Sequence, residues 1–440
     1  MSRKPLPPAL AGLPLLGNAI GFGRDRQALL RRAYDRLGPI FTIRLGPKPV
    51  AVLVGPDYHQ FFFTETDKLL SIEKPYTSLA AIFGKVAFLA PPEAYNEQRP
   101  ILHAPFRAEK MRKYVAIMQS EIQKWIDSLG DQGEMELVGA VETLVQNIAG
   151  RALMGDDFHD RVGPEFWELY RVLGKSLSVL VPPEWPLPRH IRRDRAKRRM
   201  RELMRPVIEL RRKEPEAHDD FLQEFLATPG RSGAPADDDT VIGLIRTLMF
   251  AGHETTAGQT AWTVIELLRH PDYLERVRAE VAAHLPAGAV ADGPNLRQLA
   301  HVYWAVREVE RLHPSADLLL RWVDAEFEIG GFRIPKDWLV MVSPALAHRV
   351  SSVFRQPERF DPLRYAPGRE EDHEHPFALI GFGGGRHKCA GMSFANNEMA
   401  LIAAMLVREM DLELLTPDPG VEFGVGAPRP KACRVSYRRK

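Results

Sequence analysis

The chain has 440 residues, of which 45% are hydrophobic and 26% are charged. This balance is typical of a water-soluble globular protein with a large core, and it excludes global disorder. The formal net charge of +2, from 59 basic and 57 acidic residues, gives no electrostatic reason to expect a nucleic acid as partner. The two cysteines, Cys389 and Cys433, exclude a disulfide framework and a zinc cluster built mainly from thiolates.

The N-terminal residues 1–20 are predicted to form a Pro-rich arm. They start with basic residues, but prolines interrupt the apolar stretch that follows, which argues against a signal peptide or a transmembrane anchor. No later stretch of about 18 residues stays apolar without a charge or a helix breaker. We therefore expect a cytoplasmic protein.

Regular elements follow the arm in chain order. Residues 40–45 and 50–54 favour two strands joined across a Gly-Pro turn, and residues 96–212 show mostly helical periodicity. The acidic residues 237–239 are a good start for a long helix, which is predicted over residues 240–270 and ends before a proline.

The C-terminal part adds strand-like residues 322–345 and a last helix after Cys389. The chain contains no internal repeat and no linker long enough to divide it. The sequence predicts a single domain over residues 1–440, mainly α with a minor β region.

The most informative segment, residues 381–391, places three consecutive glycines just before Arg386, His387, Lys388 and Cys389. Such glycines let the backbone turn tightly and approach a flat group, while nearby cations and a helix N-terminus stabilise a thiolate that can bind a metal. A buried structural cysteine is one alternative, and a thiol nucleophile paired with His387, without an orienting third group, is another. A P-loop is excluded because the Gly-Lys-Ser/Thr ending is missing.

This segment resembles the haem-binding loop of the cytochrome P450 superfamily of haem-thiolate monooxygenases. The family pattern, Phe-x-x-Gly-x-Arg/His-x-Cys-x-Gly, is met by Phe382, Gly385, His387, Cys389 and Gly391. The resemblance implies heme b with Cys389 as its axial iron ligand, His387 at a propionate and Phe382 beside the sulfur. It also implies the P450 fold, with a long distal helix over the haem; thiolate donation to haem iron favours O–O cleavage.

The centre of the predicted long helix reads Ala251-Gly252-His253-Glu254-Thr255. A zinc protease is excluded because the second His of His-Glu-x-x-His would fall on an alanine, whereas a polar patch at a helix bend stays an alternative. The P450 resemblance implies that Glu254 and Thr255 are the acid and the alcohol that deliver protons at the oxygen site. Ala251 and Gly252 would leave room for dioxygen and substrate.

Further motifs of the family concern the scaffold. Glu308 and Arg311 lie three residues apart on one helical face, which by itself would suggest only a surface salt bridge. The resemblance implies that they form a buried triad with Arg359. It also assigns Arg321, Arg99 and Tyr76 to the haem propionates, although the proline that follows Arg99 would disturb its helix.

Within the superfamily, the sequence looks closest to the sterol 14α-demethylase branch of soluble bacterial members. The segment Tyr76-x-x-Leu79-x-x-Ile82-Phe83-Gly84 resembles the substrate-recognition segment of that branch. Two departures are Glu254, where the branch typically has a second His, and the absence of an acid after Phe83-Gly84. The expected pocket residues Leu79, Phe83, Ala251 and Leu319 are apolar, which suits a lipophilic substrate.

The function predicted from this resemblance is insertion of one oxygen atom from O₂ into a terpenoid, a sterol-like molecule or another lipid. Sterol 14α-demethylation proper and a haem-thiolate peroxygenase or isomerase stay open as alternatives, as does a non-enzymatic haem sensor. The acid–alcohol pair favours monooxygenation, since isomerase and peroxygenase relatives usually lose it.

Electrons are expected from NAD(P)H through a reductase and a ferredoxin or flavodoxin. A basic footprint would steer this acidic partner, formed by Lys110, Arg112, Lys113, Arg386 and Lys388. The dense basic stretch of residues 190–213 is most simply a solvated helix face, with a membrane surface or an anionic substrate as the functional alternatives. We expect a monomer.

Overall fold

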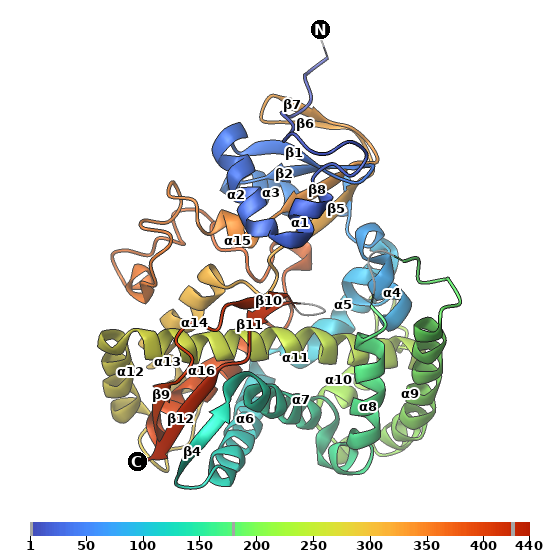
Figure 1. The fold of residues 1–440 in the computed structure, drawn as a ribbon. Helices are drawn as coiled ribbons and strands as arrows, with labels where there is room; N and C mark the ends of the chain where they lie inside the picture. Colours follow the sequence, from blue (N-terminus) through green and yellow to red (C-terminus); the bar gives the residue numbers. More distant parts are fainter. Residues whose placement is uncertain (1–2, 178–180, 424–426) are drawn as a thin grey trace. The chain divides into compact units, whose positions relative to one another are not determined.

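The computed structural model describes residues 3–177, 181–423 and 427–440. The chain forms two compact units. The first comprises Met1–Tyr76 and Glu310–Cys389, and the second comprises Thr77–Val309 and Ala390–Lys440. The expected mainly α architecture with a minor β region is confirmed (Figure 1). The single domain over residues 1–440 stays a prediction.

A five-stranded sheet organises the first unit. Its order is β1-β2-β8-β5-β3, with the strands β1 (Ile40–Leu45), β2 (Lys48–Leu53), β8 (Leu339–Val342), β5 (Leu319–Val323) and β3 (Leu70–Ser71). The predicted hairpin is confirmed: β1 and β2 are antiparallel with Ile40 opposite Leu53, and Gly46 in the turn has a φ of 62°. β2 pairs with β8 in parallel, and β8 pairs with β5 antiparallel.

The remaining elements of the first unit are short. They are α1 (Ala19–Arg24), α2 (Arg26–Leu37), α3 (Pro56–Thr64), α15 (Pro344–Ala347), the hairpin β6 (Phe327–Ile329) and β7 (Phe332–Ile334), and the 3-10 turns η1 (Lys74–Tyr76), η5 (Pro362–Tyr365) and η6 (Gly385–His387).

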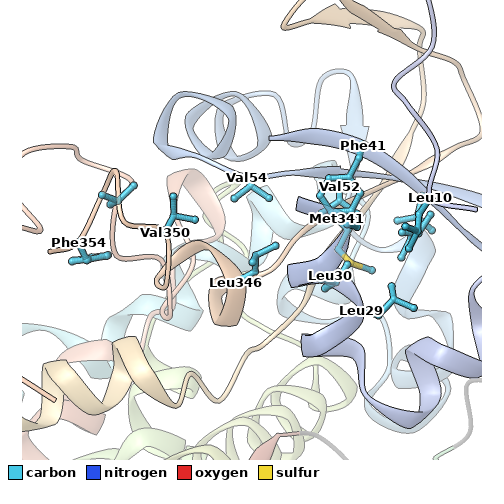
Figure 2. Close-up of a cluster of buried hydrophobic side chains, with 14 of the residues drawn as sticks. Leu10, Leu29, Leu30, Phe41, Val52, Val54, Met341, Leu346, Val350 and Phe354 are labelled. Atoms are coloured by element: carbon cyan, nitrogen blue, oxygen red, sulfur yellow. The ribbon is translucent and has the colours of Figure 1, made fainter. Parts of the chain in front are cut away.

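One core of the first unit lies between helix α2 and the sheet. The Asp25 side chain caps α2 by accepting a hydrogen bond from the Ala28 N–H at 2.9 Å. The apolar residues Leu29 and Leu30 of this helix pack in one core with Phe41 of β1 and with the neighbouring strands (Figure 2). Leu320 of β5, the strand that carries Arg321, packs against the same core.

Helix α11 (Asp238–Arg269) dominates the second unit. Its 32 residues span about 48 Å at 1.5 Å per residue. The Asp237 side chain accepts a hydrogen bond from the Thr240 N–H at 2.7 Å, and two aspartates follow in the first turn, so the predicted acidic start is confirmed. Helices α7 (Leu137–Arg161) and α16 (Met392–Glu409) pack along α11 (Figure 1).

The other helices of this unit surround that centre. They are α4 (Thr77–Phe83), α5 (Pro92–His103), α6 (Ala108–Ser128), α8 (Gly163–Gly174), α9 (Pro188–Lys213), α10 (Phe221–Ala227), α12 (Pro271–His284), α13 (Gly293–Arg297) and α14 (Ala300–Leu312), with the 3-10 turns η2 (Ala87–Leu89), η3 (Ala104–Phe106) and η4 (Pro215–Ala217). Helix α14 continues into the first unit after Val309.

Two small sheets complete the second unit. One has the order β4-β12-β9, from β4 (Gln132–Glu136), β12 (Arg434–Arg439) and β9 (Met410–Leu414), and the other pairs β10 (Val421–Phe423) with β11 (Pro428–Pro430). Among the helices in the described parts of the chain, none is both long and apolar enough to cross a membrane.

Candidate active site

The glycine-rich loop of the first unit owes its shape to its glycines. Gly383 and Gly385 have φ values of 71° and 62°, in the left-handed region that favours glycine. A Cβ atom on Gly384 would lie 2.8 Å from the rings of Phe63 and Phe377. The Cys389 N–H donates to the Phe382 oxygen at 3.0 Å, and the Cys389 thiol is exposed at the end of this loop.

Three residues that the sequence analysis assigns to haem propionates belong to the same unit. Arg321 is buried: its Nε donates to Thr66 Oγ1 at 2.9 Å, and its guanidinium lies over the Phe62 ring at 4.6 Å. Burial lowers the pKa of Arg321 to about 10. The Tyr76 hydroxyl accepts a hydrogen bond from the Leu320 N–H at 3.0 Å.

His387 has a partner that sequence reasoning missed. Its Nε2 lies 2.8 Å from Oδ2 of Asp67, which also lies 3.9 Å from Nε of Arg386. Asp67 has a φ of 69°, so it occupies a turn conformation that aspartate tolerates better than most residues. No motif marks Asp67, because it lies more than 300 residues from His387 in the sequence.

These residues fit a haem group by the chemistry of their donors. The first unit supplies an exposed thiol on a glycine loop, where added Cβ atoms would meet neighbouring rings, together with a buried arginine and a tyrosine hydroxyl. Thiolate is a known axial ligand of haem iron, and guanidinium pairs well with a carboxylate such as a propionate.

In the second unit, the middle of helix α11 is open on one side. Residues on either side of this segment are largely buried, whereas Ala251 is exposed and Gly252 through Thr255 are partly buried. A Cβ atom on Gly252 would meet nothing within 4 Å outside its own helix. The Thr255 hydroxyl donates to the Ala251 oxygen one turn earlier. The Ala251–Thr255 segment can therefore accept another molecule against the helix.

Glu254 lies in the electrostatic reach of a cluster on α7 and the β10–β11 hairpin. Arg429 donates to Glu142 and, at 2.6 Å, to Oε1 of Glu422. Burial raises the pKa of Glu142, the charge of Arg429 opposes the shift, and the charge of Glu254 adds to it. Sequence reasoning missed Arg429 and Glu142, because nothing local distinguishes them from ordinary surface charges.

The expected pocket residues of the second unit lie beside aromatic residues that the sequence analysis did not single out. The Phe83 ring lies 4.8 Å from the Phe250 ring, measured between centroids, and Tyr170 lies 6.5 Å from Phe250. Leu79 is half-buried on α4. Leu319 belongs to the first unit, where it is half-buried on β5.

The scaffold motif requires a correction. Glu308, in the second unit, and Arg311, in the first, are both fully buried. Arg359, which we expected in a buried triad, instead has an exposed side chain, and only its main-chain oxygen accepts a hydrogen bond from Arg311, at 3.0 Å. The buried arginine of this segment is Arg364, whose Nη1 lies 2.5 Å from Oε2 of Glu371. The direction of the side chains around η5 decides which of the two arginines is buried, and the motif does not encode that direction.

Two further expectations concern charges. Arg99 is exposed, and α5 runs through the proline after it, so that proline does not end the helix.

The basic footprint expected for the redox partner is partly paired: Lys110 and Lys113 both pair with Asp219, at 2.8 and 3.2 Å. The hydrogen bonds of Lys110 to Asp219 and Glu224 raise its pKa to about 12. These two cations are therefore partly neutralised, whereas Lys388 is exposed in the first unit.

Comparison with known proteins identifies the family. The model of the cytochrome P450 family matches residues 7–430. The chain belongs to the cytochrome P450 family. A sterol 14-demethylase of Arabidopsis thaliana is 32% identical over 100% of this chain and 92% of its own length. A sterol 14alpha-demethylase of Mycolicibacterium vanbaalenii is 31% identical, over 99% of this chain and 98% of its own length.

A solved structure, retinoic acid bound cyanobacterial CYP120A1, matches with a TM-score of 0.89 and 26% identity over 100% of both chains. The predicted cytochrome P450 fold is thus confirmed. This cytochrome P450 is a haem-dependent monooxygenase, an oxidoreductase that acts on a lipophilic substrate with electrons from redox partners.

Proposed function

We propose that this cytochrome P450 hydroxylates a lipophilic substrate, with Cys389 as axial ligand of heme b and with Glu254 and Thr255 as the proton-delivery pair. When bound, the haem supplies the oxygen-activating chemistry. The observation that carries the proposal is the open segment Ala251–Thr255, which contains a carboxylate and a hydroxyl in the middle of a helix that is largely buried on either side of it.

The roles of the chain's own residues follow from their surroundings. The hydroxyl of Thr255, which bonds to the main-chain oxygen one turn earlier, can release that bond and donate to a ligand at the open face. The carboxyl group of Glu254 lies near the Glu142–Arg429 pair. These charged side chains can therefore relay a proton to Glu254. Arg321, His387 and Tyr76 would hold the propionates, and Arg99 stays a predicted propionate partner.

The apolar substrate is expected to lie against Phe83, Leu79, Ala251 and Gly252, and Leu319 stays a predicted pocket residue. Retinoic acid, bound by the cyanobacterial relative, and the sterols named for the other relatives indicate isoprenoid lipids as the class to test. Sterol 14α-demethylation is the second candidate, supported by the identity with sterol demethylases along the whole chain. Glu254 and the missing acid after Gly84 argue against it.

The axial ligand is tested by the spectrum of the reduced carbon monoxide adduct. The wild-type protein should give the thiolate-type band, and Cys389→Ser should abolish it. A band typical of nitrogen-ligated haem in the wild type would refute the assignment.

Proton delivery is tested by Thr255→Ala, which should lower the product formed per NAD(P)H consumed and raise the peroxide released. Thr260→Ala is the matched control: Thr260 is on the same helix and also bonds back one turn, at 2.8 Å, but is fully buried. Equal coupling in both variants would contradict the role of Thr255.

We further propose that electrons come from NAD(P)H through a reductase and a ferredoxin or flavodoxin, and that the protein is a cytoplasmic monomer. Reconstitution with purified partners tests the first point. Sedimentation equilibrium and cell fractionation test the second, and a stable dimer or a membrane-bound fraction would contradict it.

A further inference from the structure

A basic groove lies between helices α9 and α11 of the second unit, and it is lined in part by the basic stretch of residues 190–213, which the proposed function does not use. The groove has a volume of about 420 Å³. It is lined by two isoleucines, by the acids Asp194 and Asp239, and by the cations Arg195, Lys197, Arg198, Arg201 and Arg246. Five cations against two acids give these lining residues a formal net charge of +3.

The two acids leave most of these cations without an ion pair. Asp239 pairs with Arg201, whereas Asp194 pairs at 2.8 Å with Arg193, which does not line the groove. Among the described residues, no carboxylate forms an ion pair with Arg195, Lys197, Arg198 or Arg246. The positive charge of the groove is therefore largely uncompensated.

Two of the unpaired cations lie away from water, against the end of helix α4. Arg246 is only 8% exposed, and its Nη2 donates to the main-chain oxygen of Phe83 at 3.4 Å. Lys197 is partly buried, and its Nζ donates to the main-chain oxygen of Ala81 at 2.7 Å. Both oxygens belong to the last turn of α4, which explains where the two cations are held. A carbonyl group carries only a partial charge, so neither contact supplies a counter-ion.

The cations of the groove also destabilise one another. Burial lowers the pKa of Lys197, and the charge of Arg246 lowers it further. Burial lowers the pKa of Arg246 to about 10, and the charge of Arg201 adds to that shift. The charges of Asp194 and Asp239 oppose these shifts without reversing them. Like charges held together in a partly dehydrated site are unfavourable, and a bound anion with several charges would relieve their repulsion.

Phosphate groups match this arrangement of donors. A guanidinium group presents its N–H donors in a planar fork that suits two phosphate oxygens, and an ammonium group binds phosphate as a point charge. A diphosphate brings several negative charges into one small volume, whereas a carboxylate brings only one. Arg195 and Arg198 are exposed, so a dissolved ligand can reach the groove from water. A flat lipid surface would meet these exposed arginines but would not enter the groove.

We propose that this groove binds a soluble phosphorylated molecule through a diphosphate-type group. Arg195 and Arg198 contact the phosphates from the exposed side, and Lys197 contacts them from the inner side. Arg246 adds its positive charge from behind. The inference assigns a site separate from the open segment Ala251–Thr255, and it does not rest on the proposed function.

The test titrates inorganic pyrophosphate into the haem-loaded full chain at constant ionic strength, without divalent cations, and measures the Kd by calorimetry. We expect one site per chain with a Kd below about 1 mM, and sulfate should bind at least about tenfold more weakly because it brings fewer charges. Arg195→Gln and Arg198→Gln should each weaken pyrophosphate binding about threefold, as expected for partly screened ion pairs. Lys197→Gln should weaken it about tenfold, because this charge is less exposed.

A control variant separates a defined site from the general charge of the helix. Arg205 is an exposed arginine of α9 that does not line the groove, and Arg205→Gln should leave the Kd unchanged. Circular dichroism and the carbon monoxide spectrum check that each variant is folded and holds its haem. Arg195 and Arg198 are exposed, so their variants decide the test even if Lys197→Gln does not fold.

Four outcomes overturn the inference. The first is no binding of pyrophosphate up to about 1 mM, and the second is equal affinity for sulfate and pyrophosphate. The third is an equal loss of affinity in Arg198→Gln and Arg205→Gln, which would mark diffuse attraction to a solvated basic helix. The fourth is binding of vesicles of phosphatidylcholine and phosphatidic acid that pyrophosphate does not displace, which would mark a surface for lipids instead. A nitrogen-type carbon monoxide spectrum refutes the proposed function and leaves this inference standing.

Discussion

Arg364 is predicted to stabilise the first unit more than Arg359, the arginine that the family motif singled out in the same stretch. Its side chain is fully buried, and it donates to Oε2 of Glu371 at 2.5 Å and to the main-chain oxygens of Arg355 and Arg359 at 3.0 and 3.4 Å. Arg364→Met removes the charge-assisted hydrogen bond to Glu371 and takes a donor from the carbonyl groups of Arg355 and Arg359. We expect a loss of about 4 kcal/mol in the free energy of unfolding.

The loss should not exceed this value, because Glu371 keeps other partners. Its Oε1 stays 2.6 Å from Nη2 of Arg369, and its Oε2 accepts from the Arg355 N–H at 3.0 Å. Burial raises the pKa of Glu371, but these contacts and the charge of Arg364 together hold it below its usual value. The stabilisation is therefore complete above about pH 4.5 and is lost as the pH falls through the folded-state pKa.

The assay is urea unfolding at pH 7, followed by circular dichroism. Arg359→Met is the matched control, since the Arg359 side chain is exposed, and it should change the free energy by no more than about 0.5 kcal/mol. The double variant Arg364→Met/Glu371→Leu should recover part of the loss, because it removes the buried carboxylate as well. A large effect of Arg359→Met with little effect of Arg364→Met would refute the reasoning.

Three further predictions follow. Gly384→Ala should lower the free energy of unfolding in urea by about 1–3 kcal/mol, because its Cβ would lie 2.8 Å from Phe63 and Phe377. Gly23→Ala is the control and should not destabilise the protein, since a Cβ on Gly23 would meet open space. Equal effects of the two substitutions would contradict the steric argument. His59 is buried, accepts a hydrogen bond from the Gly55 N–H at 3.1 Å, and has its pKa lowered to about 4 by desolvation. Because the unfolded chain binds the proton first, the free energy of unfolding should fall by about 3 kcal/mol as the pH drops from 7 to 4. The same pH profile in His59→Gln would count against this. In stopped-flow measurements, Lys388→Glu should slow reduction of the haem by an acidic ferredoxin, most strongly at low salt. Lys113→Glu should slow it less, because Lys113 is already paired with Asp219. The reverse order would exclude the glycine loop before Cys389 as the docking face.

Much of the fold could be predicted from local patterns. The β1–β2 hairpin follows from two apolar runs around a glycine turn, and helix α11 follows from its acidic cap and the proline after its end. The glycine loop before Cys389 could also be assigned, because left-handed φ values at Gly383 and Gly385 depend on the residue type itself. The chemistry of each candidate residue is likewise a property of its side chain.

The partners and the burial of those side chains depend on distant segments. Arg359 and Arg364 lie in one arginine-rich stretch, yet one faces solvent and the other is fully buried beside Glu371. Arg246 looks like any helical arginine in the sequence, yet the structure leaves it only 8% exposed, with its Nη2 donating to the main-chain oxygen of Phe83 on α4 at 3.4 Å. Residue types and local periodicity thus determined the family, the elements and the reactive groups. Tertiary packing alone decided which charges lose water and gain a partner, because desolvation depends on what the rest of the chain places beside them.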